Sequence, residues 1–222
     1  MVPFAHLHVH SEYSLLDGAC RIEQLVDRVA ALGQTSCALT DHGVMYGVID
    51  FYRACKAKGI HPVIGCEVYL APHSRHDRGY INGEWHSHLI LLCENMTGYK
   101  NLIHMVSLAF SEGFYMKPRI DMELLREHSE GLICMSACLA GAIPRAIANG
   151  NMDEAYEICE QFLEIFDREH FYLEIQDHGI DAQQHILPLL IRLARETGIP
   201  LVATNDAHYL RKEDSKMQSI LI

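Results

Sequence analysis

Two pairs of potential metal ligands stand two residues apart in this sequence. His8 and His10 end one short apolar segment, and Asp206 and His208 end another. Side chains alternate between the two faces of a strand, so residues at this spacing point the same way and can bind one ion. Imidazole nitrogens and carboxylate oxygens together suit Zn, Mn or Fe. The two pairs therefore predict metal-dependent chemistry.

Further ligand-type residues end other apolar segments. His42 follows one such segment and Glu67 ends the next. A lone histidine at a strand end is usually structural, but two spaced pairs together with these residues favour a shared metal site. The set is too large for one tetrahedral ion, which indicates a cluster of ions. Histidine makes up 15 of the 222 residues, an excess that agrees with this prediction.

The segments that must position these side chains alternate in type. Short apolar runs alternate with amphipathic runs of helical length, and such units in series predict parallel strands joined by helices. A barrel and an open doubly wound sheet are both compatible with this pattern, and each gathers strand ends at one edge. The polar stretch at 72–84 is predicted to be a loop. The predicted strands are 4–8, 36–42, 61–67 with an extension to 70, 88–93, 131–138, 171–175 and 199–206, and the predicted helices are 21–32, 48–58, 98–110, 143–148, 153–166, 185–197 and 212–222.

The composition is that of a globular protein, with 49% hydrophobic and 21% charged residues. The formal net charge of -11 means that nucleic acid would need a local cationic site. Eight cysteines form no CxxC pair, and no signal peptide or membrane-spanning run is present. Glycine-rich nucleotide-binding motifs are also absent. These features predict reduced thiols, no membrane association and a cytoplasmic location.

The sequence resembles the polymerase and histidinol phosphatase (PHP) domain family, in the branch found at the amino terminus of the alpha subunit of bacterial DNA polymerase III. The resemblance covers essentially the whole chain. It rests on His-Leu-His-Val-His-Ser at 6–11, Thr-Asp-His-Gly at 40–43 and Ala-Thr-Asn-Asp-Ala-His-Tyr at 203–209. The other matching segments are 13–18, 65–69, 113–121 and 131–138. The 113–121 segment and the Asn-Asp-Ala-His-Tyr ending are typical of the polymerase branch.

The resemblance implies a distorted seven-stranded (β/α) barrel, similar to a TIM barrel, with a metal site at the C-terminal rim of the strands. It also implies three divalent metal ions, Zn, Mn or Fe, bound by nine side chains. Glu67 is expected to bridge two ions, and Asp206 or His208 to help handle the leaving-group proton. The implied ligands are His8, His10, Asp17, His42, Glu67, His88, Cys138, Asp206 and His208.

The implied activity is metal-dependent phosphodiester hydrolysis, in the form of a 3'-to-5' exonuclease that proofreads for a polymerase. Its expected partners are the primer 3' end of DNA, the remainder of the polymerase chain and other replicase subunits. Residues 1–222 are expected to form a single PHP domain truncated from a much longer chain, with the polymerase active site outside it. Tyr115, Lys117 and Arg119 are candidate DNA contacts, and a solvated basic loop is the alternative interpretation.

Several assignments have alternatives. His86 competes with His88 as a ligand, and a buried structural cysteine is the alternative for Cys138. The function could also be that of a metal-binding scaffold of the polymerase, a free-standing phosphatase or a metal amidohydrolase, although no strand-end lysine typical of many amidohydrolases is found. Other polar residues near strand ends either orient ligands or are ordinary loop residues: Asp41, Gln176, Asp177 and His178.

Overall fold

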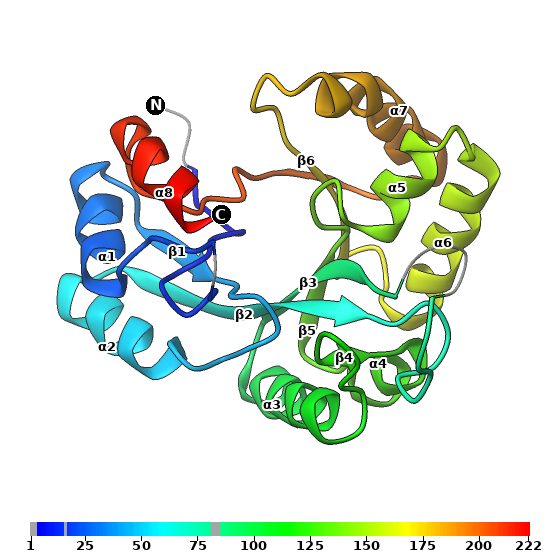
Figure 1. The fold of residues 1–222 in the computed structure, drawn as a ribbon, viewed down its shortest axis with the longest axis horizontal. Helices are drawn as coiled ribbons and strands as arrows, with labels where there is room; N and C mark the ends of the chain where they lie inside the picture. Colours follow the sequence, from blue (N-terminus) through cyan, green and yellow to red (C-terminus); the bar gives the residue numbers. More distant parts are fainter. Residues whose placement is uncertain (1–3, 16, 81–84) are drawn as a thin grey trace.

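The computed structural model describes residues 4–15, 17–80 and 85–222, which form a curled sheet with helices packed around it (Figure 1). Residues 81–84 of the predicted loop, and Leu16 of the 13–18 motif, lie outside the described residues. The strands are β1 (Ser36–Leu39), β2 (His61–Leu70), β3 (Ser87–Cys93), β4 (Arg119–Ile120), β5 (Leu132–Met135), β6 (Phe171–Ile175) and β7 (Leu201–Ala203).

The strand order is β1-β2-β3-β5-β6-β7, and β4 pairs with the end of β2. The β1–β2, β5–β6 and β6–β7 pairs are parallel, but β3 is antiparallel to both β2 and β5. The prediction of parallel strands throughout is therefore wrong for β3. The described part of the connection from β2 to β3 contains no crossover helix, so β3 returns in the opposite direction. As a result, the start of β3 lies beside the end of β2, with His88 opposite Tyr69.

The amino-terminal segment closes the sheet into a barrel. On one side the carbonyl of His6 accepts a hydrogen bond of 2.7 Å from the Ala38 N–H, and on the other the His10 N–H donates to Ala207 over 2.9 Å. The contacts are isolated bridges, so the strand predicted at 4–8 is not a continuous one. One apolar cluster draws side chains from this segment and from β1, β2, β3, β5, β6 and β7. The fold is therefore a distorted barrel and not an open doubly wound sheet.

Helices cover the outside of the barrel, and polar residues or glycines define several of their ends. Asn95 and Asp121 accept backbone N–H groups at the starts of α3 and α4, while Gly59 and Gly198 end α2 and α7 in the left-handed conformation. Helix α4 and strand β4 were not predicted. In the described chain no helix is long and apolar enough to cross a membrane. The helices are α1 (Ile22–Ala31), α2 (Val48–Lys58), α3 (Met96–Ser111), α4 (Met122–His128), α5 (Ala142–Ala148), α6 (Met152–Ile165), α7 (Asp181–Thr197) and α8 (Ser215–Leu221), with a 3-10 turn at Lys212–Asp214.

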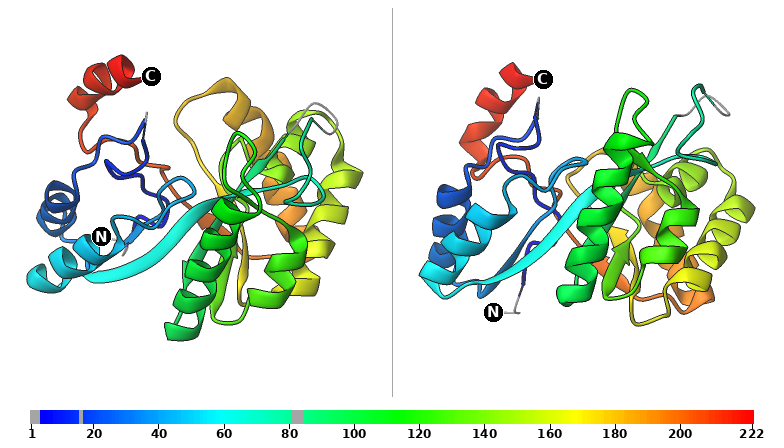
Figure 2. Two further views of the ribbon diagram at one scale, coloured as in Figure 1. Left: turned by 60° about the horizontal axis from the view of Figure 1, so that its bottom comes forward. Right: turned by 90° about the horizontal axis from the view of Figure 1, so that it is seen from below.

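Three strands end earlier than predicted, and polar residues lie in the turns that follow. β1 ends before Asp41 and His42, and β7 ends before Asp206, whose φ is 44°. β5 ends before Ala137, because its φ of 63° is incompatible with extended backbone. In Figure 2 the loops that follow β2 and β6 project from one end of the barrel together with α8. This end is the rim at which the sequence predicted a site.

Candidate metal centre

Glu67 lies at the centre of the predicted site, on the part of β2 that reaches the rim. Its side chain is 1% exposed. Oε1 lies 3.2 Å from His8 Nε2 and 2.9 Å from His88 Nδ1. Oε2 contacts His42 Nδ1 and lies 3.9 Å from His10 Nε2. One buried carboxylate therefore joins histidines from the amino-terminal segment, the turn after β1 and the start of β3.

The amino-terminal histidine pair meets Asp206 beside Glu67. His8 and His10 are fully buried, and their Nε2 atoms lie 3.1 Å apart. Asp206 Oδ1 lies 3.1 Å from His8 Nε2 and 3.2 Å from His10 Nε2. Backbone pairing between Val9 and Ala207 explains this arrangement, because it places the residues after β7 next to the amino-terminal segment. The two segments marked by the spaced pairs are thus neighbours in the barrel.

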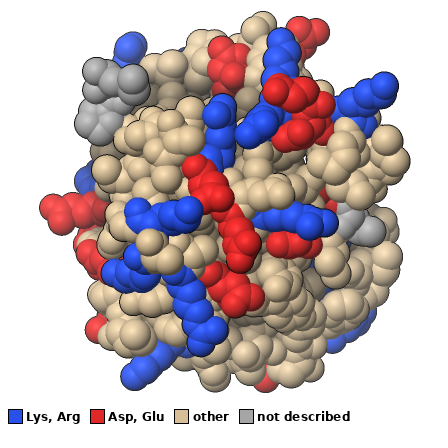
Figure 3. All heavy atoms as spheres, turned by 90° about the vertical axis from the view of Figure 1, so that its left-hand side faces the viewer, with Lys and Arg blue, Asp and Glu red and all other residues tan. Residues whose placement is uncertain are grey.

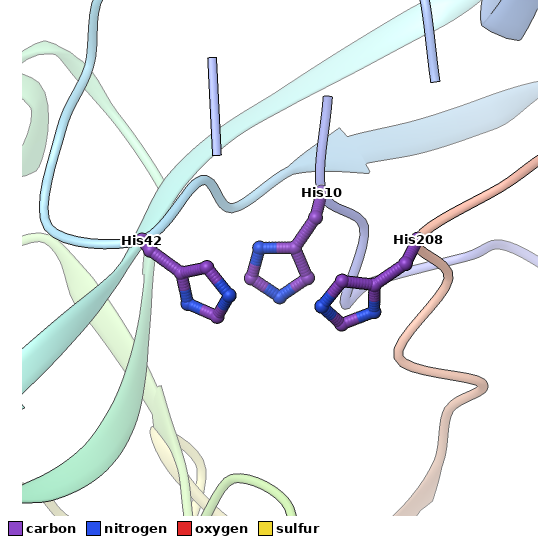
Figure 4. Close-up of side chains that lie close together, drawn as sticks. All are labelled: His10, His42 and His208. Carbon is purple, nitrogen blue, oxygen red and sulfur yellow. The ribbon is translucent and has the colours of Figure 1, made fainter. Parts of the chain in front are cut away.

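A second group of histidines stacks toward the mouth of the site. Figure 4 shows the rings of His10, His42 and His208 side by side, with centroids 4.0 Å apart for the first pair and 4.3 Å for His10 and His208. Asp17 Oδ2 lies 3.0 Å from His42 Nε2 and 3.9 Å from His208 Nε2. Asp17 and His208 are 33% and 20% exposed, respectively, so this side of the site opens to solvent.

His88, and not His86, faces the centre. His88 Nδ1 contacts Glu67, and Cys138 Sγ lies 3.8 Å from the same nitrogen. The His86 ring stacks on His88 and meets the edge of the Tyr69 ring. His88 is close to the site although it starts its strand, because β3 is antiparallel to β2. Burial, with the nearby charges of Glu67 and Asp206, raises the pKa of the Cys138 thiol well above its usual value.

The donor set fits divalent cations. Several buried atoms that face this space make no well-oriented hydrogen bond although imidazole nitrogens or carboxylate oxygens lie close to some of them, including both oxygens of Glu67, Oδ1 of Asp17 and of Asp206, and Nδ1 of His42. Carboxylate oxygens packed this closely against imidazole nitrogens suit a bound cation, and mixed nitrogen and oxygen ligands suit Zn, Mn or Fe. Three groups of side chains hold ligand atoms within 4.8 Å of one another: His10, His42 and His208; His8, His10 and Asp206; and His42, Glu67 and His88.

In the absence of metal, the contacts among these side chains shift the pKa values of the histidines. Burial lowers the pKa of His42, but Asp17 and Glu67 outweigh it and raise that pKa to about 10. Burial also lowers the pKa of His8, but the charges of Glu174 and Asp206 outweigh it and raise this pKa well above its usual value. Burial of His10 lowers its pKa to about 4, so this ring is neutral at pH 7. Metal ions must therefore displace protons from some of these ligands but not from others.

Glu174 on β6 is a functional candidate that sequence analysis missed. Its side chain is fully buried, and its Oε1 lies 2.7 Å from His8 Nδ1. Gln176 donates to the same oxygen over 2.9 Å, and the Thr204 hydroxyl also donates to it. A carboxylate that accepts the second N–H of a histidine fixes the orientation and tautomer of a metal ligand. The available signal was Glu174 and Gln176 two residues apart at a strand end.

Asp41 supports the other amino-terminal histidine. It accepts hydrogen bonds from the Ser11 N–H and hydroxyl and from the Ser14 hydroxyl, at 2.7–2.8 Å. Ser14 Oγ in turn lies 2.9 Å from His10 Nδ1. The predicted orienting roles therefore fit Asp41 and Gln176. The printed contacts of the two other candidates do not reach a proposed ligand: Asp177 accepts from Gly179, and His178 contacts Gln183 on α7.

The three predicted DNA contacts lie close together in the sequence, Tyr115 and Lys117 in the turn before β4 and Arg119 at its start, but they differ in exposure. Lys117 Nζ lies 5.2 Å from the centre of the Tyr69 ring, which is itself 5.3 Å from the His88 ring. Tyr115 is half-buried. Arg119 is only 1% exposed, and its guanidinium donates to the carbonyls of four residues. The prediction that Arg119 touches DNA does not fit this position, because its N–H groups already hold the loops together.

Comparison with known families decides the wider classification. The PHP domain family matches residues 6–178, most of the barrel and all but two of the predicted ligands. The chain belongs to the PHP domain family. Over 99% of its length it is 50% identical to the DNA polymerase III subunit alpha of Treponema pallidum, and it is 44% identical to that of Thermus aquaticus. It spans 19% and 18% of these relatives, about a fifth of their length.

Solved structures share the fold of this PHP domain. A protein described as a metal-dependent phosphoesterase, from Bifidobacterium adolescentis, superimposes with a TM-score of 0.62 over 94% of this chain and 89% of its own, at 11% identity. An amidohydrolase from Chromobacterium violaceum gives a TM-score of 0.55 over 98% of this chain and 96% of its own, at 15% identity. At such identities the likeness concerns the fold alone, and it agrees with the distorted barrel.

Proposed function

We propose that this PHP domain hydrolyses phosphodiester bonds with three divalent metal ions, Zn, Mn or Fe. The observation that carries the proposal is the convergence of ring nitrogens on the buried carboxylate of Glu67, whose two oxygens make no well-oriented hydrogen bond. When bound, the ions would supply Lewis acidity and lower the pKa of a water molecule toward neutrality. The proposed ligands are His8, His10, Asp17, His42, Glu67, His88, Cys138, Asp206 and His208.

The chain's own residues orient the donor atoms. The Asp206 carbonyl, 2.9 Å from His208 Nδ1, can only accept, so this nitrogen carries the proton and Nε2 keeps a lone pair. Glu174 engages Nδ1 of His8 in the same way and leaves its Nε2 for the site. Glu67 offers its two oxygens to different histidines and is suited to bridge two ions. Asp206 and His208 are 16% and 20% exposed, so they can pass the leaving-group proton to solvent.

The proposed substrate is the 3' end of a DNA primer, and the proposed reaction is 3'-to-5' exonuclease cleavage. Similarity to DNA polymerase III alpha subunits supports this choice. In this proposal residues 1–222 act as one PHP domain of a polymerase chain in the cytoplasm, beside the rest of that chain and other replicase subunits. Lys117 and Tyr115 are the proposed DNA contacts, because Lys117 lies over Tyr69, whose ring neighbours that of His88, and Tyr115 meets Trp85 edge-on.

The test combines elemental analysis with hydrolysis of a 3'-mismatched primer, for the unaltered chain and for an Asp206→Asn, His208→Ala double variant. The proposal predicts about three metal ions per chain, release of nucleotides from the 3' end, and loss of this release in the variant. Bound metal without nucleotide release would contradict the proposal. That result would favour a metal-stabilised scaffold of the polymerase.

A further inference from the structure

Four nearly parallel aromatic rings lead from the surface to the candidate metal centre. Tyr80 and Trp85 stack with centroids 4.7 Å apart and planes at 20°. Trp85 and His86 follow at 6.2 Å and 21°, and His86 and His88 at 5.8 Å and 16°. Tyr115 meets Trp85 edge-on, with centroids 6.3 Å apart. We call the Tyr80–Trp85–His86–His88 series the ring ladder.

The ring ladder has one end in solvent. Tyr80 is 62% exposed, Trp85 and His86 are half-buried, and His88 contacts Glu67. The rings come from the described parts of the loop after β2 and from the start of β3, at the rim that Figure 2 shows. Burial of apolar surface does not explain the outer end, because a ring this exposed contributes little to folding. An exposed aromatic face near the proposed phosphodiester-cleaving centre suits a nucleobase.

Two cations belong to this region: Lys117 lies over the Tyr69 ring, which meets the His86 ring edge-on, and Arg78 stands two residues before Tyr80. Within the described part of the chain, Lys117 and Arg78 have no carboxylate at ion-pair distance; Lys117 lies over Tyr69, and Arg78 donates to the carbonyls of Arg75, Asp77 and Glu112. One other face carries charges of both signs. On the face that includes α1 and α2, Lys and Arg side chains are interspersed with Asp and Glu (Figure 3). Lys117 and Arg78 can therefore supply the cations that a protein of net charge -11 needs to approach a phosphate backbone.

We propose that Tyr80 and Trp85 form a stacking platform for the bases of single-stranded DNA, with Lys117 and Arg78 facing its phosphates. The inference rests on the proposed exonuclease function and extends it to the substrate: the strand approaches over the loop after β2, and its end reaches the metal centre past His86. Stacking is sequence-tolerant, since every base has a π-face. The platform therefore binds unpaired ends of any sequence.

Trp85 is the only tryptophan of the chain, so its fluorescence reports directly on stacking. The experiment titrates the metal-loaded chain with an oligothymidylate whose phosphorothioate linkages slow hydrolysis. Tryptophan emission reports on stacking, and the fluorescence anisotropy of a labelled strand reports on binding. We expect quenching on binding, and at least about a fivefold loss of affinity for Tyr80→Ala. Tyr52→Ala is the matched control: its ring is also exposed and lies 5.5 Å from a lysine, but on α2.

Binding without quenching, no binding at all, or equal affinities for Tyr80→Ala and Tyr52→Ala would each overturn the platform. Hydrolysis of bis(p-nitrophenyl) phosphate by the unaltered chain tests the metal centre separately, because this substrate has no bases. Hydrolysis without quenching refutes the platform alone. Quenching without hydrolysis refutes the proposed function alone.

Discussion

Replacement of Glu174 by glutamine tests how the barrel holds its proposed metal ligands. The carboxylate is fully buried and lies 2.7 Å from His8 Nδ1, so it fixes the His8 ring with Nε2 toward Glu67 and Asp206. Glutamine has nearly the same volume but no charge, and its amide can present N–H groups to the ring. Loss of such an orienting partner typically weakens metal binding 10- to 100-fold, or about 1.4–2.7 kcal/mol.

The assay for Glu174→Gln is competition for Zn or Mn against a chromophoric chelator, with circular dichroism to verify the fold. Glu169→Gln is the matched control, because Glu169 is an exposed residue just before β6. We expect weaker metal binding for the Glu174 variant and unchanged binding for the control. Equal affinity in both variants would refute the reasoning, since it would mean that His8 is not a ligand or is oriented without Glu174.

Three other predictions follow from the described contacts. Metal binding at pH 7 should release protons, because the pKa of His42 is raised to about 10, and the affinity for metal should fall as the pH falls. Calorimetry in two buffers of different ionisation enthalpy measures the proton release. A heat of binding that is independent of the buffer would count against this prediction. Cys138→Ala should weaken metal binding, whereas Cys159→Ala, at a buried position on α6, should only destabilise the fold. Elemental analysis and thermal melts would separate these two effects. Equal metal content in the two variants would argue against a thiolate ligand. Arg119→Met should lower the free energy of unfolding by about 3 kcal/mol, because four carbonyls lose their donor. Lys117→Met should change the same free energy by less than about 0.5 kcal/mol. Urea denaturation measures both, and equal effects would contradict the structural role of Arg119.

The spacing of ligand-type residues predicted much of the candidate site. His8 and His10, like Asp206 and His208, could be recognised because a two-residue spacing at a strand end has a direct geometric meaning. The barrel itself followed from the resemblance, since alternation of segments left an open sheet as an alternative. The structure decides between them through the amino-terminal segment, which pairs with β1 and with the residues after β7 by isolated bridges that leave little pattern in the sequence.

The direction of β3 could not be predicted, because an apolar run has the same pattern whichever way the strand points. This ambiguity left His88, at the start of its predicted strand, in competition with His86 as a ligand, although His88 faces Glu67. Glu174 was missed for a related reason: within a strand, an acidic residue between apolar neighbours is expected to face solvent. Its burial depends on its partners His8 and Thr204, which come from distant parts of the chain.

The most direct test of the central claim is product analysis with a 3'-mismatched primer labelled at its 5' end. The unaltered chain, Glu67→Gln and the control Glu169→Gln are each assayed before and after metal chelation. The account predicts stepwise shortening from the 3' end by the unaltered chain and the control, abolished by chelation and lost in Glu67→Gln. Equal shortening by Glu67→Gln, or none by the metal-loaded unaltered chain, would contradict the assignment of phosphodiester hydrolysis to this centre.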